Sequence, residues 1–166
     1  MSDTGRTEPG AGRPTKESRT MGQVQATTER VYDAAPERVY EALADYQVIR
    51  PKLLPAQYSE YEVRVGGTGA GTQVHWKLQA TEKRVRDCLL TVSAPRPDQL
   101  VEKDANSSMV VTWTVAAAGE GRTRVTVTAT WQGATGIGGF FERTFAPKGL
   151  NRIHDEVLAN LAAEVR

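Results

Sequence analysis

The stretch Gly-Ile-Gly-Gly-Phe-Phe at residues 136–141, together with the chain that follows it to Arg166, indicates the architecture of the protein. Apolar side chains recur there mostly three or four positions apart, at Phe141, Phe145, Leu150, Ile153, Val157, Leu161 and Val165. This spacing places them on one face of an α-helix. A helix of about 27 residues reaches roughly 40 Å at 1.5 Å per residue. The sequence therefore predicts one long C-terminal helix with a single buried face.

Pro147 lies inside this predicted helix. A proline there removes a backbone hydrogen bond and clashes with the preceding turn, which costs about 3 kcal/mol or more. We therefore expect a kink over residues 143–147, or a short helix that ends before Pro147, and Gly149 weakens the same turn. Since three glycines stand just upstream, the segment 136–149 is either a moving lid or a static bend that fits the sheet.

Upstream of the helix, the sequence predicts a series of β-strands, with helices only between the first strand and the second. A first strand is expected over residues 24–32, a helix begins at Pro36 and ends near Asp45, and one or two helical turns follow over 47–54. Six further strands are predicted at 58–65, 72–80, 84–93, 99–104, 109–115 and 125–131. Because short turns join these strands, the sequence predicts an antiparallel meander.

One face of each strand is apolar, and the terminal helix is the only element long enough to cover that face. We expect a cavity between sheet and helix because many of the inward residues are small, with a solid core as the alternative. The residues predicted to line it are Tyr61, Val63, Val74, Trp76, Leu78, Met109, Val111, Trp113, Val127, Trp131, Phe141, Phe145 and Ile153.

Three stretches resemble the START/polyketide-cyclase superfamily, also called SRPBCC or the Bet v 1-like helix-grip fold. They are residues 31–45 with an Ala-Pro-Glu-x-Val helix start, the Thr/Val-rich hairpin around Gly119–Gly121, and residues 138–164. The resemblance implies an α+β fold, with a seven-stranded curved antiparallel sheet around a long C-terminal helix and two short helices after the first strand. Members bind lipids, sterols or polyketides, and some catalyse cyclisation or dehydration. Residues 47–51 lack the tryptophan often found after the first helix.

Two functions fit this pattern best. The first is a carrier or sensor of a small hydrophobic molecule, such as a lipid, a polyketide or another aromatic metabolite. The second is a polyketide cyclase or dehydratase, and a protein-binding adaptor with a solid core is a third. An enzyme requires at least two polar side chains inside the cavity, and no pair of carboxylates is predicted there, which favours the carrier. Tyr61 is the best catalytic candidate, as a hydrogen-bond donor to a carbonyl or enolate.

The remaining reactive residues are predicted to be structural. His75 falls on the polar face of its strand, and His154 lies at the edge of the apolar helix face. Cys88 alternates with apolar neighbours and is predicted to be a small buried residue. The sequence has no metal-ligand spacing, and we expect neither a metal nor another cofactor. The glycine-rich stretch 66–71 lies between two strands and opens no helix, so we interpret it as a turn.

Composition limits the partners. The chain has 166 residues, 21 basic and 20 acidic side chains and a formal net charge of +1, which suggests neither nucleic acid nor membrane binding. Residues 1–21 are predicted to be a disordered tail, since residues 1–20 contain no Val, Ile, Leu, Phe, Tyr or Trp. Residues 22–166 then form a single domain. A single cysteine, with no signal peptide or membrane span, predicts a cytoplasmic protein.

Overall fold

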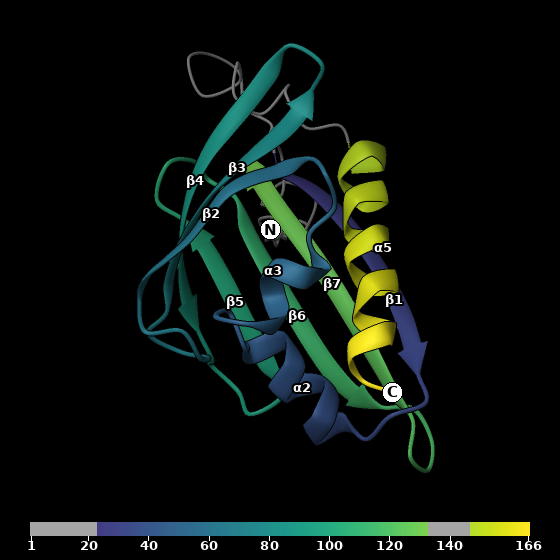
Figure 1. Cartoon of the computed structure of the whole chain (residues 1–166). Coiled ribbons are helices and arrows are strands. Elements are labelled where there is room, and N and C mark those ends of the chain that lie inside the picture. Colours follow the sequence, from purple (N-terminus) through teal and green to yellow (C-terminus); the bar gives the residue numbers. More distant parts are fainter. Residues whose placement is uncertain (1–22, 133–146) are drawn as a thin grey trace, which may run out of the picture.

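A computed structural model of the protein describes residues 23–132 and 147–166 (Figure 1). The elements follow the predicted order of strand, short helices, six strands and terminal helix. Their bounds are β1 Gln23–Tyr32, α2 Pro36–Ala44, α3 Ile49–Leu53, β2 Tyr58–Val65, β3 Gln73–Thr81, β4 Arg84–Ser93, β5 Gln99–Asp104, β6 Val110–Ala117, β7 Thr123–Gln132 and α5 Pro147–Glu164.

The strands form one seven-stranded antiparallel sheet in the order β1-β7-β6-β5-β4-β3-β2. Strands β2 to β7 follow one another as a meander, and β1 pairs with β7 along its full length, from Gln23 opposite Gln132 to Tyr32 opposite Thr123. Figure 1 shows α5 lying across this sheet beside β1, with α2 and α3 on the same side of the sheet. The predicted helix-grip architecture is therefore confirmed.

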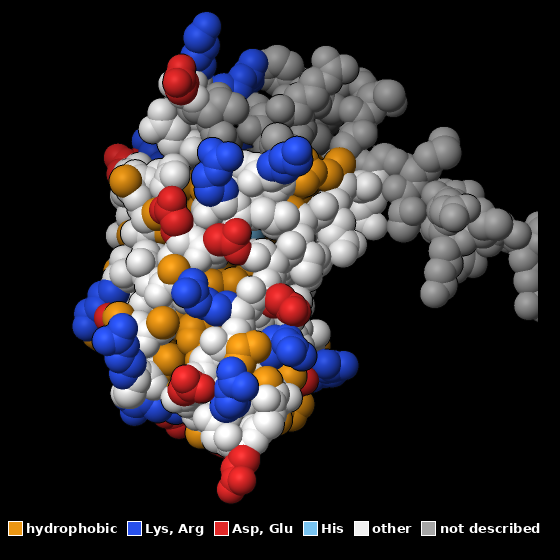
Figure 2. All heavy atoms as spheres, turned by 90° about the vertical axis from the view of Figure 1, so that its right-hand side faces the viewer, with side chains coloured by type: hydrophobic (Ala, Val, Ile, Leu, Met, Phe, Trp, Pro, Cys, Tyr) orange, Lys and Arg blue, Asp and Glu red, His pale blue; other side chains and the backbone are white. Residues whose placement is uncertain are grey.

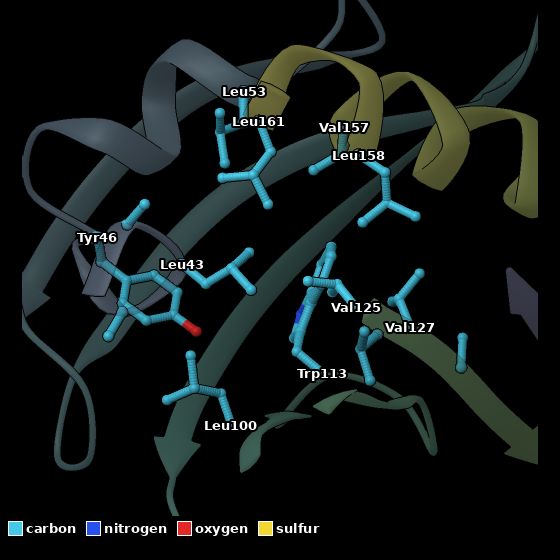
Figure 3. Close-up of a cluster of buried hydrophobic side chains, with 14 of the residues drawn as sticks. Leu43, Tyr46, Leu53, Leu100, Trp113, Val125, Val127, Val157, Leu158 and Leu161 are labelled. Atoms are coloured by element: carbon cyan, nitrogen blue, oxygen red, sulfur yellow. The ribbon is translucent and has the colours of Figure 1, made fainter. Parts of the chain in front are cut away.

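The core lies between the sheet and α5, because alternate residues of each strand point toward the helix. On β7, Val125, Val127 and Ala129 are fully buried and alternate with more exposed neighbours. Figure 3 shows Val157 and Leu158 of α5 pointing toward the strand residues that carry this core. The single buried face predicted for the helix is confirmed in its described part, with Leu150, Ile153, Val157, Leu158 and Leu161 all buried.

The described part of the terminal helix, α5, runs over Pro147–Glu164 and has 18 residues, and the part predicted before Pro147 lies outside the described residues. Pro147 is the first residue of this described part, a position that tolerates proline because the N–H it lacks would have no intrahelical partner there. Phe141, Phe145 and all but the last three residues of segment 136–149, the proposed lid or bend, lie outside the described residues. Hydrogen bonds attach α5 and the residues after it to the rest of the chain: the buried Tyr32 hydroxyl donates to the Leu158 carbonyl at 2.6 Å, Asn160 Nδ2 donates to the Leu53 carbonyl at 3.0 Å, and the Arg38 Nε donates to the Val165 carbonyl at 3.1 Å.

The glycine-rich stretch is the β2–β3 loop, and it attaches the α2–α3 connection to the sheet. The Tyr46 backbone N–H donates to the Gly67 carbonyl at 2.9 Å, and Asp45 forms an isolated β-bridge with Thr68. Gly66 has φ +70°, and a Cβ there would lie 3.1 Å from the Thr72 Cα. Glycine is needed here for the backbone conformation and for close packing, so the interpretation as a turn agrees with the structure.

His75 corrects one prediction, because it is buried at 9% exposure although it lies on the outer face of β3. Strand β2 has a register shift between Ser59 and Glu62, and Glu60 within it adopts φ 52°. This bulge brings the Glu60 carbonyl to 3.2 Å from His75 Nδ1, while Asp87 of β4 contacts Nε2 at 2.5 Å. The bulge in β2 therefore buries His75, which a regular alternation of inward and outward residues would leave exposed.

The outer surface is mixed in charge. Figure 2 shows acidic and basic side chains interspersed over the side of the molecule that carries α5 and β1. None of the described helices is long and apolar enough to cross a membrane.

Candidate ligand-binding cavity

A cavity lies between the inner face of the sheet, the first turns of α5 and the junction of α3 with β2. About 30 Å³ is open to the centres of water molecules. This is room for about two waters, since one needs about 10–15 Å³ by this measure. The lining residues are Arg50, Leu54, Tyr58, Trp76, Leu78, Cys88, Leu90, Glu102, Asp104, Met109, Val111, Trp113, Leu150, His154 and Val157.

The structure brings part of the predicted lining together at this cavity. Trp76, Leu78, Met109, Val111 and Trp113 all line it. Other predicted residues pack elsewhere in the core: Val74, Val127, Trp131 and Ile153 are buried, and Tyr61 and Val63 are partly buried against it. A binding role for each of these side chains stays a prediction.

An ion pair that the sequence did not reveal lies in the cavity wall. Arg50 of α3 places its Nη2 3.0 Å from Glu102 Oε2 of β5, with the two side chains 3% and 2% exposed. The Arg50 Nε donates to the Leu43 carbonyl at 2.6 Å. The guanidinium carbon lies 4.7 Å from the ring centre of Tyr46 and 4.5 Å from that of Trp113. Arg50 is thus bound by an anion, a carbonyl and two aromatic faces.

Both oxygens of Glu102 are engaged. The Tyr46 hydroxyl donates to Oε2 at 2.5 Å, and the Trp113 indole N–H donates to Oε1 at 2.9 Å. Burial raises the pKa of Tyr46 well above its usual value, so the phenol stays a neutral donor. A buried ion pair is tolerated when hydrogen bonds satisfy its remaining polar atoms, and this network does so.

Two carboxylates line the cavity, whereas none was predicted there. Strand β5 points Leu100, Glu102 and Asp104 inward, so its inner face is largely polar. Asp104 is engaged with β4 and with the turn that follows β5: Oδ1 accepts the backbone N–H groups of Leu89 and Asn106, and Oδ2 accepts the Ser107 hydroxyl at 2.7 Å. Its carboxylate therefore fixes the β5–β6 turn.

Tyr61, the predicted catalytic candidate, does not line the cavity. Its hydroxyl donates to the Tyr46 carbonyl at 2.5 Å, and its ring stacks on Trp76 with centres 6.0 Å apart. Burial raises its pKa. These contacts support Trp76 and the α2–α3 connection, and a catalytic role for Tyr61 stays a prediction.

His154 of α5 lies in the cavity wall, where the sequence predicted only packing at the helix edge. It is 4% exposed, and its ring meets the edge of Trp113 at 5.8 Å between centres. Its Nδ1 has no hydrogen-bond partner among the described residues. Burial, and after it the nearby Arg50 charge, lowers the pKa of His154 to about 4. The imidazole is therefore neutral at physiological pH.

Cys88 also lines the cavity, and burial raises the pKa of its thiol to about 12. Such a thiol is a poor nucleophile at neutral pH, which agrees with its predicted role as a small buried residue. In the part of the chain that the structure describes, no group of three or more His, Cys, Asp or Glu side chains could hold a metal ion.

A curved antiparallel sheet closed by one helix over an internal cavity defines the helix-grip class of proteins. Residues 23–166 match the family described as polyketide cyclase / dehydrase and lipid transport. The chain belongs to this family.

Several solved structures are similar. The solution structure of the KanY protein is 54% identical, with 87% of this chain and 99% of that chain covered and a TM-score of 0.78. A protein from Thermus thermophilus is 23% identical, covers 86% of this chain and 97% of its own, and has a TM-score of 0.68. The ZhuI aromatase/cyclase from a Streptomyces species is 14% identical, with 86% and 91% covered and a TM-score of 0.61. The last two show the fold alone. Comparison with curated proteins gave no match.

Proposed function

We propose that this protein binds a small, mostly apolar or aromatic molecule in the cavity between the sheet and α5, as a carrier or sensor. The observation that carries this proposal is an internal cavity whose wall includes Trp76, Trp113 and Tyr58 beside aliphatic side chains. Family membership supports it, since the family description includes lipid transport and polyketide cyclases. Each ligand methylene removed from water would contribute about 0.8 kcal/mol.

The cavity favours a compact ligand. Because the cavity has room for only about two waters, a guest with even one ring requires side chains at the wall to move, and the flexible Met109 is the side chain best suited to do so. A cytoplasmic location is proposed with this function, supported by a single, buried and unpaired cysteine.

The direct test is native mass spectrometry of protein purified from its own host. We expect a copurified apolar molecule that is lost from Val111→Phe, because this substitution fills the cavity from β6. Thr112→Phe is the matched control, since the next residue along β6 points to the other face of the sheet. A wild-type protein that carries no small molecule and binds no aromatic probe would contradict the proposal.

A second candidate, a cyclase or dehydratase, is favoured by one observation. Arg50, Glu102 and His154 converge on the cavity, and an enzyme of this kind requires polar groups there. Stoichiometry separates the two functions. The protein is mixed with a hundredfold excess of a poly-β-ketone thioester. A carrier retains one unmodified ligand per chain, whereas an enzyme converts all of the thioester to cyclised product.

A further inference from the structure

We propose that the ligand carries a neutral hydroxyl group, as a phenol does, and that this hydroxyl binds Nδ1 of His154. This inference rests on the proposed function and specifies the ligand class. His154 lines the cavity, and its buried Nδ1 has no hydrogen-bond partner among the described residues; this atom is closed to water, so the imidazole must turn or the wall must shift for a ligand to reach it. An unpaired buried polar atom is unfavourable, so a ligand that supplies its partner gains affinity that an apolar ligand of the same shape lacks.

The other polar groups of the wall are poorer anchors because they already hold one another. Glu102 accepts from Tyr46 and Trp113 and pairs with Arg50. Asp104 accepts three hydrogen bonds from its own turn and from β4. A ligand that bound either carboxylate would compete with these partners, whereas His154 Nδ1 has none among the described residues.

The charge of the wall favours a neutral group. One guanidinium, that of Arg50, stands against the two carboxylates of Glu102 and Asp104, which leaves a formal charge of −1 beside a neutral His154. A carboxylate or phosphate ligand would be repelled there. A hydroxyl both donates and accepts, so it satisfies Nδ1 in either tautomer of the neutral imidazole, which a ketone cannot do.

The rest of the wall favours an aromatic skeleton. The Trp113 ring contacts the His154 ring edge-on, and Trp76 and Tyr58, with ring centres 5.6 Å apart, form another part of the wall. A flat ring packs well against such surfaces. In a phenol, the ring would therefore pack against the aromatic side chains of the wall, and the hydroxyl would supply the hydrogen bond that Nδ1 lacks.

The test uses three probes of similar size in NMR titrations of the full chain. Phenol and toluene differ only in a hydroxyl against a methyl group, and benzoate supplies a negative charge. The readouts are the indole N–H signal of Trp113 and the imidazole ¹⁵N signals of His154. We expect phenol to shift the Nδ1 signal of the wild type. Phenol should bind His154→Leu about tenfold more weakly than the wild type, because the variant loses one buried hydrogen bond to the ligand. Toluene should bind both proteins equally.

His154→Gln is the conservative variant, and we expect it to keep part of the preference for phenol over toluene. Dispersed amide spectra of both variants show that they are folded. The inference is overturned if toluene and phenol respond equally to His154→Leu, or if benzoate binds more tightly than phenol; the proposed function then still stands. If none of the probes binds the wild type, the inference and the cavity-binding function both fail.

Discussion

His154 should make the protein less stable in mild acid. The pKa of a histidine in an unfolded chain is about 6.5, whereas burial lowers the pKa of His154 to about 4 in the folded state. Between these values the unfolded chain binds a proton that the folded chain does not. The free energy of unfolding therefore falls as the pH falls through this window, and this contribution is fully lost below the folded pKa.

The magnitude follows from the two pKa values. A difference of about 2.5 units corresponds to about 3 kcal/mol over the whole window, of which about 2 kcal/mol is lost between pH 7 and pH 5. Most carboxylates are still ionised at pH 5, so few other groups contribute over this interval. The assay is urea unfolding of wild type and His154→Gln at both pH values, because glutamine is polar but does not titrate.

We expect the wild type to lose about 2 kcal/mol more than His154→Gln between pH 7 and pH 5. At pH 7, His154→Leu should be at least as stable as the wild type, since it removes a buried polar atom that lacks a partner among the described residues. Equal acid sensitivity of wild type and His154→Gln, or an NMR titration of His154 with a pKa above 6, would refute the reasoning.

Three other predictions concern stability and reactivity. Arg50→Met or Glu102→Leu alone should cost about 3–5 kcal/mol by leaving a buried charge unpaired, and the double variant should cost less than the sum in urea unfolding. At pH 8 a disulfide reagent should label Cys88 about a thousandfold more slowly in the folded than in the unfolded protein, because burial raises its pKa from 9.0 to about 12. Gly149→Ala should stabilise the start of α5 by up to about 1 kcal/mol in thermal unfolding, whereas Gly66→Ala, at φ +70°, should destabilise.

The fold could be predicted because its signals are local and periodic. Alternation along β7 places Val125, Val127 and Ala129 inward, and the observed burial follows that pattern. The chain around Pro147 could not be read in the same way. Pro147 has two meanings in a helical pattern, a break inside a helix or the first residue of one, and periodicity alone does not separate them.

The polar part of the candidate site was missed because it joins distant segments. Nothing near Arg50 in the sequence indicates that a short helix will place it against Glu102, which lies on a strand. Two signals were nevertheless present. Glu102 alternates with Leu100 on β5, and His154 is four residues after Leu150 and three before Val157, so both positions fall on faces that the pattern marks as buried.

The same geometry bears on the choice between carrier and enzyme. General acid–base catalysis works best when the catalytic group has a pKa near the working pH. His154, with a pKa of about 4, is a weak base at neutral pH, and the Glu102 carboxylate is already held by Arg50, Tyr46 and Trp113. A neutral imidazole that stays unprotonated at the working pH is better suited to holding a hydroxyl than to removing its proton. The cavity as built therefore favours recognition of a ligand over its conversion.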